Sequence, residues 1–134
     1  MADLTIGTVV ANSVTTTLRG YTYGDTIAAG DVVYLDSSNN KVKPAECDGT
    51  QSQARAIGIA YEAGVDNDTK FICTSGYIDV GAALSIGDSY VVSANAGKIA
   101  AVADLGSGHY VTHLGYAVST DEINLRPYAE GVQA

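Results

Sequence analysis

The two histidines are the residues of this chain whose type best suits metal binding or acid–base chemistry. His109 and His113 lie four residues apart in a segment that we predict to be extended, so their side chains would share one face of a strand. A zinc site needs a third and usually a fourth ligand, and the nearest candidate in the sequence is Asp104, in a predicted loop. We therefore interpret both histidines as polar or half-buried strand residues, and we predict no metal site.

Two short segments carry fragments of known functional motifs. Asp66-Asn67-Asp68 is similar to the start of a calcium-binding loop, but Phe71 and Tyr77 occupy the positions that need Gly and Glu. Ser107 lies near His109, yet a nucleophile elbow places its serine in Gly-x-Ser-x-Gly between a strand and a helix, and no helix is predicted here. We expect a turn and a flexible loop at these positions, no catalytic residue and no enzyme.

The two cysteines point to no cofactor either. Cys47 lies in a polar stretch and is predicted to be exposed, whereas Cys73 lies in an apolar run and is predicted to be in the core. Neither has the spacing of a zinc knuckle. Without export, reduced thiols are expected.

Charge and hydropathy argue against nucleic acid and a membrane as direct partners. A net charge of −8 argues against direct nucleic-acid binding, because phosphate contacts need clustered Lys and Arg. No apolar run is long enough to span a bilayer. The first residues, MADLTIGTVV, lack the basic and apolar regions of a signal peptide, which predicts synthesis in the cytoplasm.

The elements that would position these residues are arranged as a repeat. Ile27–Ala45 aligns with Leu84–Val102 at an offset of 57, and the same offset aligns Ile57–Ala60 with Leu114–Ala117. Each copy opens with Gly-Asp, a turn signal, and continues with β-branched and aromatic residues. A short polar loop then ends in Asn40 or Gly97, the residue types that best tolerate positive φ. We predict that each copy forms a β-hairpin.

This pattern predicts an all-β chain. Short strands separated by turn signals, with no convincing helical period, indicate a compact β-barrel or sandwich built from two similar halves that each contain a hairpin. We divide the chain into residues 1–26 and a β domain, 27–134, with repeats at about 27–80 and 84–134. We expect a polar loop at 46–53, separate strands at 70–73 and 76–80, and a last strand at 122–125.

Residues 1–26 have no counterpart in the repeat, and two interpretations stay open. They form either an ordinary edge strand or an extended N-terminal arm that adds a strand to a neighbouring protein. Four apolar residues would then make the contact: Leu4, Ile6, Val9 and Val10.

Tyrosine is unusually frequent, with nine copies against one phenylalanine and no tryptophan. Tyrosine is favoured at interfaces and sugar sites because it joins a rigid apolar ring to a hydroxyl, but it also replaces Phe and Trp in a thin core. Both interpretations stay open. Outside the repeat, three tyrosines are candidate interface aromatics: Tyr21, Tyr23 and Tyr128.

Four segments in this order resemble the capsid cement, or head decoration, proteins of tailed bacteriophages, including a phage domain long described only as of unknown function. They are AAGDVVYLDSSNNKVKPA, ARAIGIA, IGDSYVVSANAGKIA and YVTHLGYA, within a similarity that runs from about Tyr23 to about Leu125. The resemblance implies a β-rich virion protein that binds the outer surface of the expanded capsid. It also implies that the protein is commonly a homotrimer and that it stabilises the shell by bridging subunits of the major capsid protein.

One alternative of a different class stays open. A tail-associated or carbohydrate-binding β-module would use surface tyrosines to stack on sugars.

Overall fold

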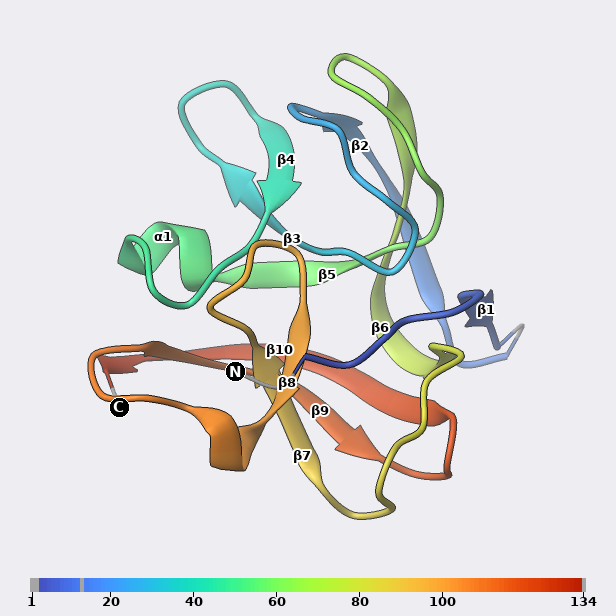
Figure 1. The fold of residues 1–134 in the computed structure, drawn as a ribbon. Coiled ribbons are helices and arrows are strands. Elements are labelled where there is room, and N and C mark those ends of the chain that lie inside the picture. Colours follow the sequence, from blue (N-terminus) through green and yellow to red (C-terminus); the bar gives the residue numbers. More distant parts are fainter. Residues whose placement is uncertain (1–2, 13, 134) are drawn as a thin grey trace.

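Five strands close into a small barrel in the first half of the chain, in the upper part of Figure 1. They are β2 (Thr17–Tyr23), β3 (Val32–Asp36), β4 (Lys41–Pro44), β5 (Ala56–Ala60) and β6 (Thr69–Asp79). The order is β2-β4-β3-β5-β6, and β6 pairs back onto β2. Only the β2–β4 pairing within this ring is parallel. This computed structural model describes residues 3–12 and 14–133, with side chains up to Ala129.

The barrel interior is filled by one buried side chain from each strand. The cluster consists of Tyr23, Val33, Val42, Ala60 and Ile72, together with Ile27 from the turn before β3. Closing a sheet in this way removes its free edges. The barrel is therefore a packed core of its own and not a channel.

The second half forms an open sheet in the lower part of Figure 1. It contains β7 (Ser89–Val92), β8 (Ile99–Ala101), a 3₁₀ turn η1 (Val102–Asp104), β9 (Tyr110–Ala117) and β10 (Glu122–Gln133). The order β6-β10-β9-β7-β8 makes β6 a member of both halves. A two-residue strand, β1 (Val10–Ala11), pairs with the end of β6.

The internal repeat is present in the structure, and equivalent hydrogen bonds occur in the two copies. The amide of Gly30 donates to the carbonyl of Ala60 at 2.8 Å, and Gly87 donates to Ala117 at 2.9 Å. Both predicted hairpins, β3–β4 and β7–β8, are confirmed. Their loops end in residues with positive φ, 57° at Asn40 and 79° at Gly97, as expected. The all-β fold with two similar halves is thus the observed one.

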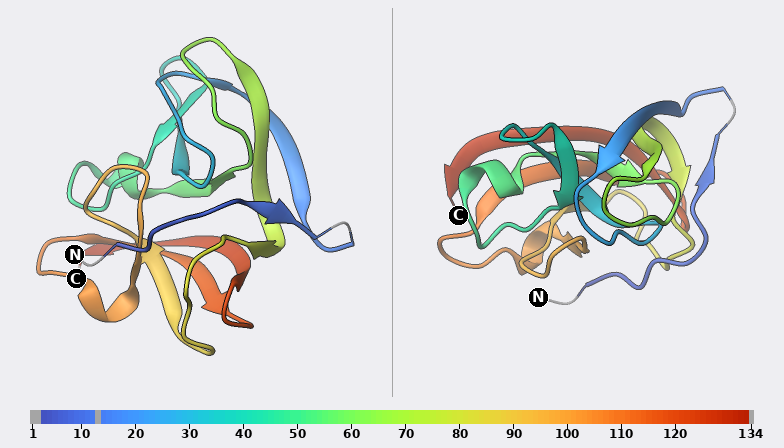
Figure 2. Two further views of the ribbon diagram at one scale, coloured as in Figure 1. Left: turned by 45° about the vertical axis from the view of Figure 1, so that its right-hand side comes forward. Right: turned by 90° about the horizontal axis from the view of Figure 1, so that it is seen from above.

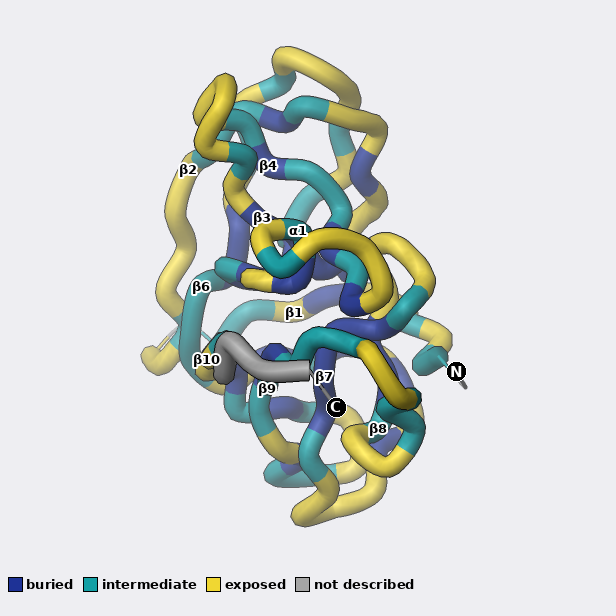
Figure 3. The backbone as a smooth tube through the Cα atoms, turned by 90° about the vertical axis from the view of Figure 1, so that its left-hand side faces the viewer, coloured by how far each residue is buried: buried dark blue, intermediate teal, exposed yellow. Residues whose placement is uncertain are grey.

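The larger hydrophobic cluster lies between the two halves. Residues from barrel strands and from the open sheet share it, among them Val32, Ile59, Cys73, Ile78, Leu114 and Leu125. Figure 3 shows the buried segments gathered where the halves meet, while most of β2 is exposed. Strand β5 is therefore covered on both faces, because Ile59 packs between the halves and Ala60 packs into the barrel.

Three expectations about the elements were wrong. The strands predicted at 70–73 and 76–80 are one strand, β6, in which Gly76 adopts a φ of 104° and allows the chain to bend. The last strand continues past Pro127, because a register shift between Leu125 and Tyr128 accommodates a residue without an amide hydrogen. The polar loop at 46–53 contains the start of a short helix, α1 (Gln51–Ala54).

Cys47 is buried, and its predicted exposure was wrong. Its amide donates to the carbonyl of Ser93 at 2.9 Å, and its carbonyl accepts from the amide of Tyr110 at 2.8 Å. These two bonds tie the polar stretch around Cys47 to the second half. Cys73 is buried as predicted.

Candidate interaction surfaces

The segment before β1 lies against its own domain. The amide of Leu4 donates to the carbonyl of Ile99 at 2.8 Å, and the amide of Gly7 donates to Val80 at 3.0 Å. Asp3 forms an antiparallel bridge with Ala100. This segment, residues 3–12, therefore runs from edge strand β8 to β6 and spans the open side of the second sheet (Figure 2).

The four residues predicted for capsid contact separate into two groups. Leu4 and Ile6 are half-buried and pack against the core between the halves, and Val9 is buried in it. Val10 is 51% exposed. Three of the four thus pack against the chain itself, and Val10 is the one whose side chain is largely exposed.

A second exposed valine follows closely. The Asn12 carboxamide oxygen accepts hydrogen bonds from the amides of Val14 at 2.9 Å and Thr15 at 3.1 Å. The amide of Thr16 donates to the Asn12 carbonyl at 3.0 Å, which fixes the turn. Val14 is 90% exposed on it. We call Val10 and Val14 the apolar tip; Figure 2 shows β1 at the outer edge of the molecule.

The candidate interface tyrosines have three different environments. Tyr23 is fully buried in the barrel, so its assignment to an interface was wrong. The alternation along β2 turns its ring inward, and Tyr21 is half-buried against the same cluster. Tyr128 is 65% exposed on β10.

The structure reveals exposed tyrosines that the sequence did not single out. Asn124 of β10 lies directly opposite Tyr77 of β6 on one side and Tyr116 of β9 on the other. Directly opposite residues point to the same face of a sheet. Tyr77 is 39% exposed and Tyr116 is 47% exposed. We call Tyr77, Asn124 and Tyr116 the tyrosine row.

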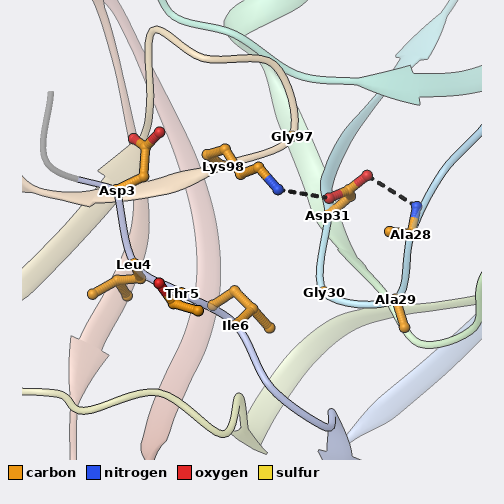
Figure 4. A pocket seen from close by; sticks show the side chains of 10 residues that line it. All are labelled: Asp3, Leu4, Thr5, Ile6, Ala28, Ala29, Gly30, Asp31, Gly97 and Lys98. Carbon is orange, nitrogen blue, oxygen red and sulfur yellow. Dashed lines mark hydrogen bonds and ion pairs between the residues drawn. The ribbon is translucent and has the colours of Figure 1, made fainter.

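A cavity of about 350 Å³ lies where segment 3–12 meets both halves (Figure 4). Asp31 lines it, accepting a 3.0 Å hydrogen bond from the amide of Ala28, with the Lys98 ammonium 3.9 Å away. Burial raises the pKa of the Asp31 carboxyl, and these two neighbours oppose the rise only in part. Asp3 lies on the other side and accepts from Asn95 at 2.7 Å and from the Ser93 hydroxyl. The contacts of Asp3 tie the N-terminal segment to the second half, and the Asp31–Lys98 pair links the two halves.

The residues considered for catalysis or metal binding do not come together. His109 lies in a turn, where its Nδ1 accepts from the amide of Gly106 at 3.0 Å, and His113 lies in β9. Their predicted placement in one strand was wrong. Asp66 and Asn67 form a turn whose side chains accept from the Lys41 ammonium. Over residues 3–12 and 14–133, no group of three His, Cys, Asp or Glu side chains has the arrangement of a metal site.

Both cysteine thiols are shielded from solvent. Cys47 and Cys73 are free and buried, and burial raises the pKa of each to about 11. Such thiols are almost fully protonated near neutral pH and are poor nucleophiles.

In the described part of the chain, no helix has the length and apolar character needed to cross a bilayer. No protein-family model matches the sequence, and no curated protein matches it.

Proposed function

We propose that this chain is a structural protein of a tailed-phage virion that binds the outer surface of the expanded capsid and bridges subunits of the major capsid protein. The observation that carries the proposal is the placement of the four segments that resemble cement proteins. One segment in each half forms its turn and hairpin, and the other two contain β5 and the whole of β9. The resemblance thus falls on the repeated framework of the fold and not on scattered loops.

The apolar tip is the part of the N-terminal region that we assign to capsid contact. Val10 and Val14 are exposed, whereas Leu4, Ile6 and Val9 anchor the segment to the domain. An exposed apolar side chain gains about 1.5–3 kcal/mol when a partner buries it fully. One tip alone would bind weakly.

Oligomerisation would turn such a modest contact into firm attachment. A homotrimer at a three-fold position of the shell presents three tips to three equivalent capsid subunits. Linked contacts of this kind raise overall affinity well above that of one contact. The protein would be made in the host cytoplasm and would reside on the outer capsid surface.

Co-sedimentation with expanded heads that lack the protein tests the proposal. We expect the wild-type chain to pellet with heads and Val10→Asp/Val14→Asp to lose at least about tenfold in affinity. The control is Val65→Asp, which changes a valine that is 53% exposed in a loop of the barrel. Failure of the wild-type chain to bind heads would overturn the proposed function. Equal binding by wild-type and tip variant would overturn only the assignment to the tip.

A further inference from the structure

The geometry points to a binding site for a neutral polysaccharide on the outward face of β6, β10 and β9, with Tyr77 and Tyr116 as stacking platforms and Asn124 between them. This site goes beyond capsid binding and uses no residue of the apolar tip. It also uses different tyrosines from those that the sequence suggested.

The register of three adjacent strands sets the spacing of the rings. Asn124 is the direct partner of both Tyr77 and Tyr116, so the three side chains form a straight row across the sheet. Neighbouring strands lie about 4.8 Å apart, which places the two rings about 10 Å from each other. That separation spans a disaccharide unit, so the two rings can stack on every second sugar of an extended glycan.

The chemistry of the row suits a sugar. The face of a tyrosine ring is electron-rich and packs well against the C–H groups on one side of a pyranose. The Asn124 carboxamide between the rings offers both a donor and an acceptor for sugar hydroxyls. Aromatic platforms with a few placed polar groups are typical of small-ligand sites.

Hydrogen bonds fix the backbone of the row on both sides. The Tyr77 amide donates to the Thr15 hydroxyl at 3.2 Å, and the Tyr77 carbonyl accepts from the Thr16 hydroxyl at 2.7 Å. Tyr116 pairs with both Ser89 and Asn124. Tyrosine has few rotatable bonds, so ordering these rings on a fixed sheet costs little entropy.

The exposed area fits a glycan better than a protein. Tyr77 and Tyr116, which are 39% and 47% exposed, together leave on the order of 200 Å² of surface within reach of a ligand. A standard protein interface buries roughly 800 Å² on each partner. The row is thus too small to hold a protein by itself and large enough for two or three sugar rings.

Charge selects among glycans. Asp79 and Glu122 face each other across β6 and β10, two residues along from Tyr77 and Asn124, and therefore lie on the same face. Two carboxylates at the border of the site repel an anionic polymer. We therefore assign a neutral polysaccharide to this face.

Affinity electrophoresis in gels that contain a soluble polysaccharide tests the site. The panel consists of xyloglucan, mixed-linkage β-glucan, galactomannan and dextran, with alginate as the anionic member. We expect at least one neutral polymer to retard the wild-type chain and alginate to leave it unaffected. Tyr77→Ala and Tyr116→Ala should each weaken binding about tenfold.

Two matched controls separate stacking from general loss of structure. Phe71→Ala removes an aromatic ring that is 50% exposed on the barrel part of β6, and it should bind like wild type. Tyr77→Phe/Tyr116→Phe keeps both rings and should retain binding. The inference is overturned if no neutral polymer retards the wild-type chain, or if Phe71→Ala loses as much affinity as the row variants. Head binding is measured separately, so failure here leaves the capsid proposal intact.

Discussion

The phenol of Tyr23 donates a 2.6 Å hydrogen bond to the backbone carbonyl of Glu62 inside the closed barrel. Tyr23 is fully buried, so this bond satisfies a hydroxyl that water does not reach. It also ties the end of β2 to the chain that leaves β5. The residue suggested for an interface is instead a central support of the fold.

Tyr23→Phe should destabilise the protein by about 1–2 kcal/mol, because it removes this bond and leaves the Glu62 carbonyl without the phenol. Urea unfolding followed by circular dichroism measures the loss. A control, Tyr128→Phe, alters an exposed hydroxyl and should change stability little. Equal stability of wild type and Tyr23→Phe would contradict the importance of the bond.

Stability should fall as pH rises from about 10 to 12. Burial and the nearby Glu62 carboxylate raise the pKa of Tyr23 to about 12, so the unfolded chain releases this proton first and unfolding is favoured in that interval. The two buried thiols act in the same direction from about pH 9 to 11. Tyr23→Phe should show a shallower decline above pH 10 than wild type. Identical slopes in denaturation series at fixed pH would speak against this linkage.

Gly58→Ala should destabilise the chain by at least about 2–3 kcal/mol, because a Cβ there collides with the carbonyl oxygen of Cys73 on β6. The matched control is Gly20→Ala in β2, where a Cβ meets no atom within 4 Å. That variant should be as stable as wild type or slightly more so. Urea midpoints compare the two, and similar losses for both would refute the close approach of β5 to β6.

Both thiols should resist a disulfide reagent in the native protein. Cys47 and Cys73 are buried and their pKa values are about 11, so labelling at pH 8 should be slow. In 6 M guanidinium we expect two thiols per chain to react at once. Rapid reaction of one native thiol would contradict the burial of Cys47 between the halves.

Asp31→Asn and Asp31→Ala should change the free energy of unfolding by different amounts, or in opposite directions. Burial raises the pKa of Asp31, so the charged form is disfavoured in the folded state and the contribution of Asp31 to stability should increase as pH falls through its raised pKa. Asparagine removes the charge and keeps an acceptor for the Ala28 amide, and it should be neutral or stabilising at pH 7. Alanine loses that acceptor and should cost about 1 kcal/mol. Thermal unfolding at pH 5 and pH 7 distinguishes these outcomes.

The proposed homotrimer predicts a solution mass close to three chains of 13.8 kDa. Light scattering after size exclusion, at several concentrations, measures it directly. A mass of one chain at every concentration would contradict a trimer in free solution.

Local sequence was sufficient for the hairpins but not for the way they assemble. Gly-Asp turns and the loop residues Asn40 and Gly97 determine local backbone geometry, and these predictions were confirmed. The parallel pairing of β2 with β4 and the closure onto β6 depend on contacts between distant residues, which no short period records. Cys47 was misplaced for the same reason, since the strands that cover it come much later in the chain.

The residues of the candidate surfaces were likewise predictable only where the signal in the sequence is local. Period-2 alternation cannot say which face of a strand is covered, so Tyr23 was named as a candidate interface residue and Tyr77 was not. One missed element did have a local signal: Thr50 and Gln53 form a capping box at the start of α1. The tyrosine row had none, because its members are neighbours only through the register of three strands.

The position of strand β6 has a further consequence for how the protein unfolds. Its first part completes the barrel with β2 and β5, and its last part begins the open sheet with β10 and β1. The strand lies within the first copy of the repeat, yet it also begins the sheet of the second copy, so no cut along the chain yields two self-sufficient pieces. The duplicated halves should therefore melt as one cooperative unit, despite having two separate hydrophobic clusters.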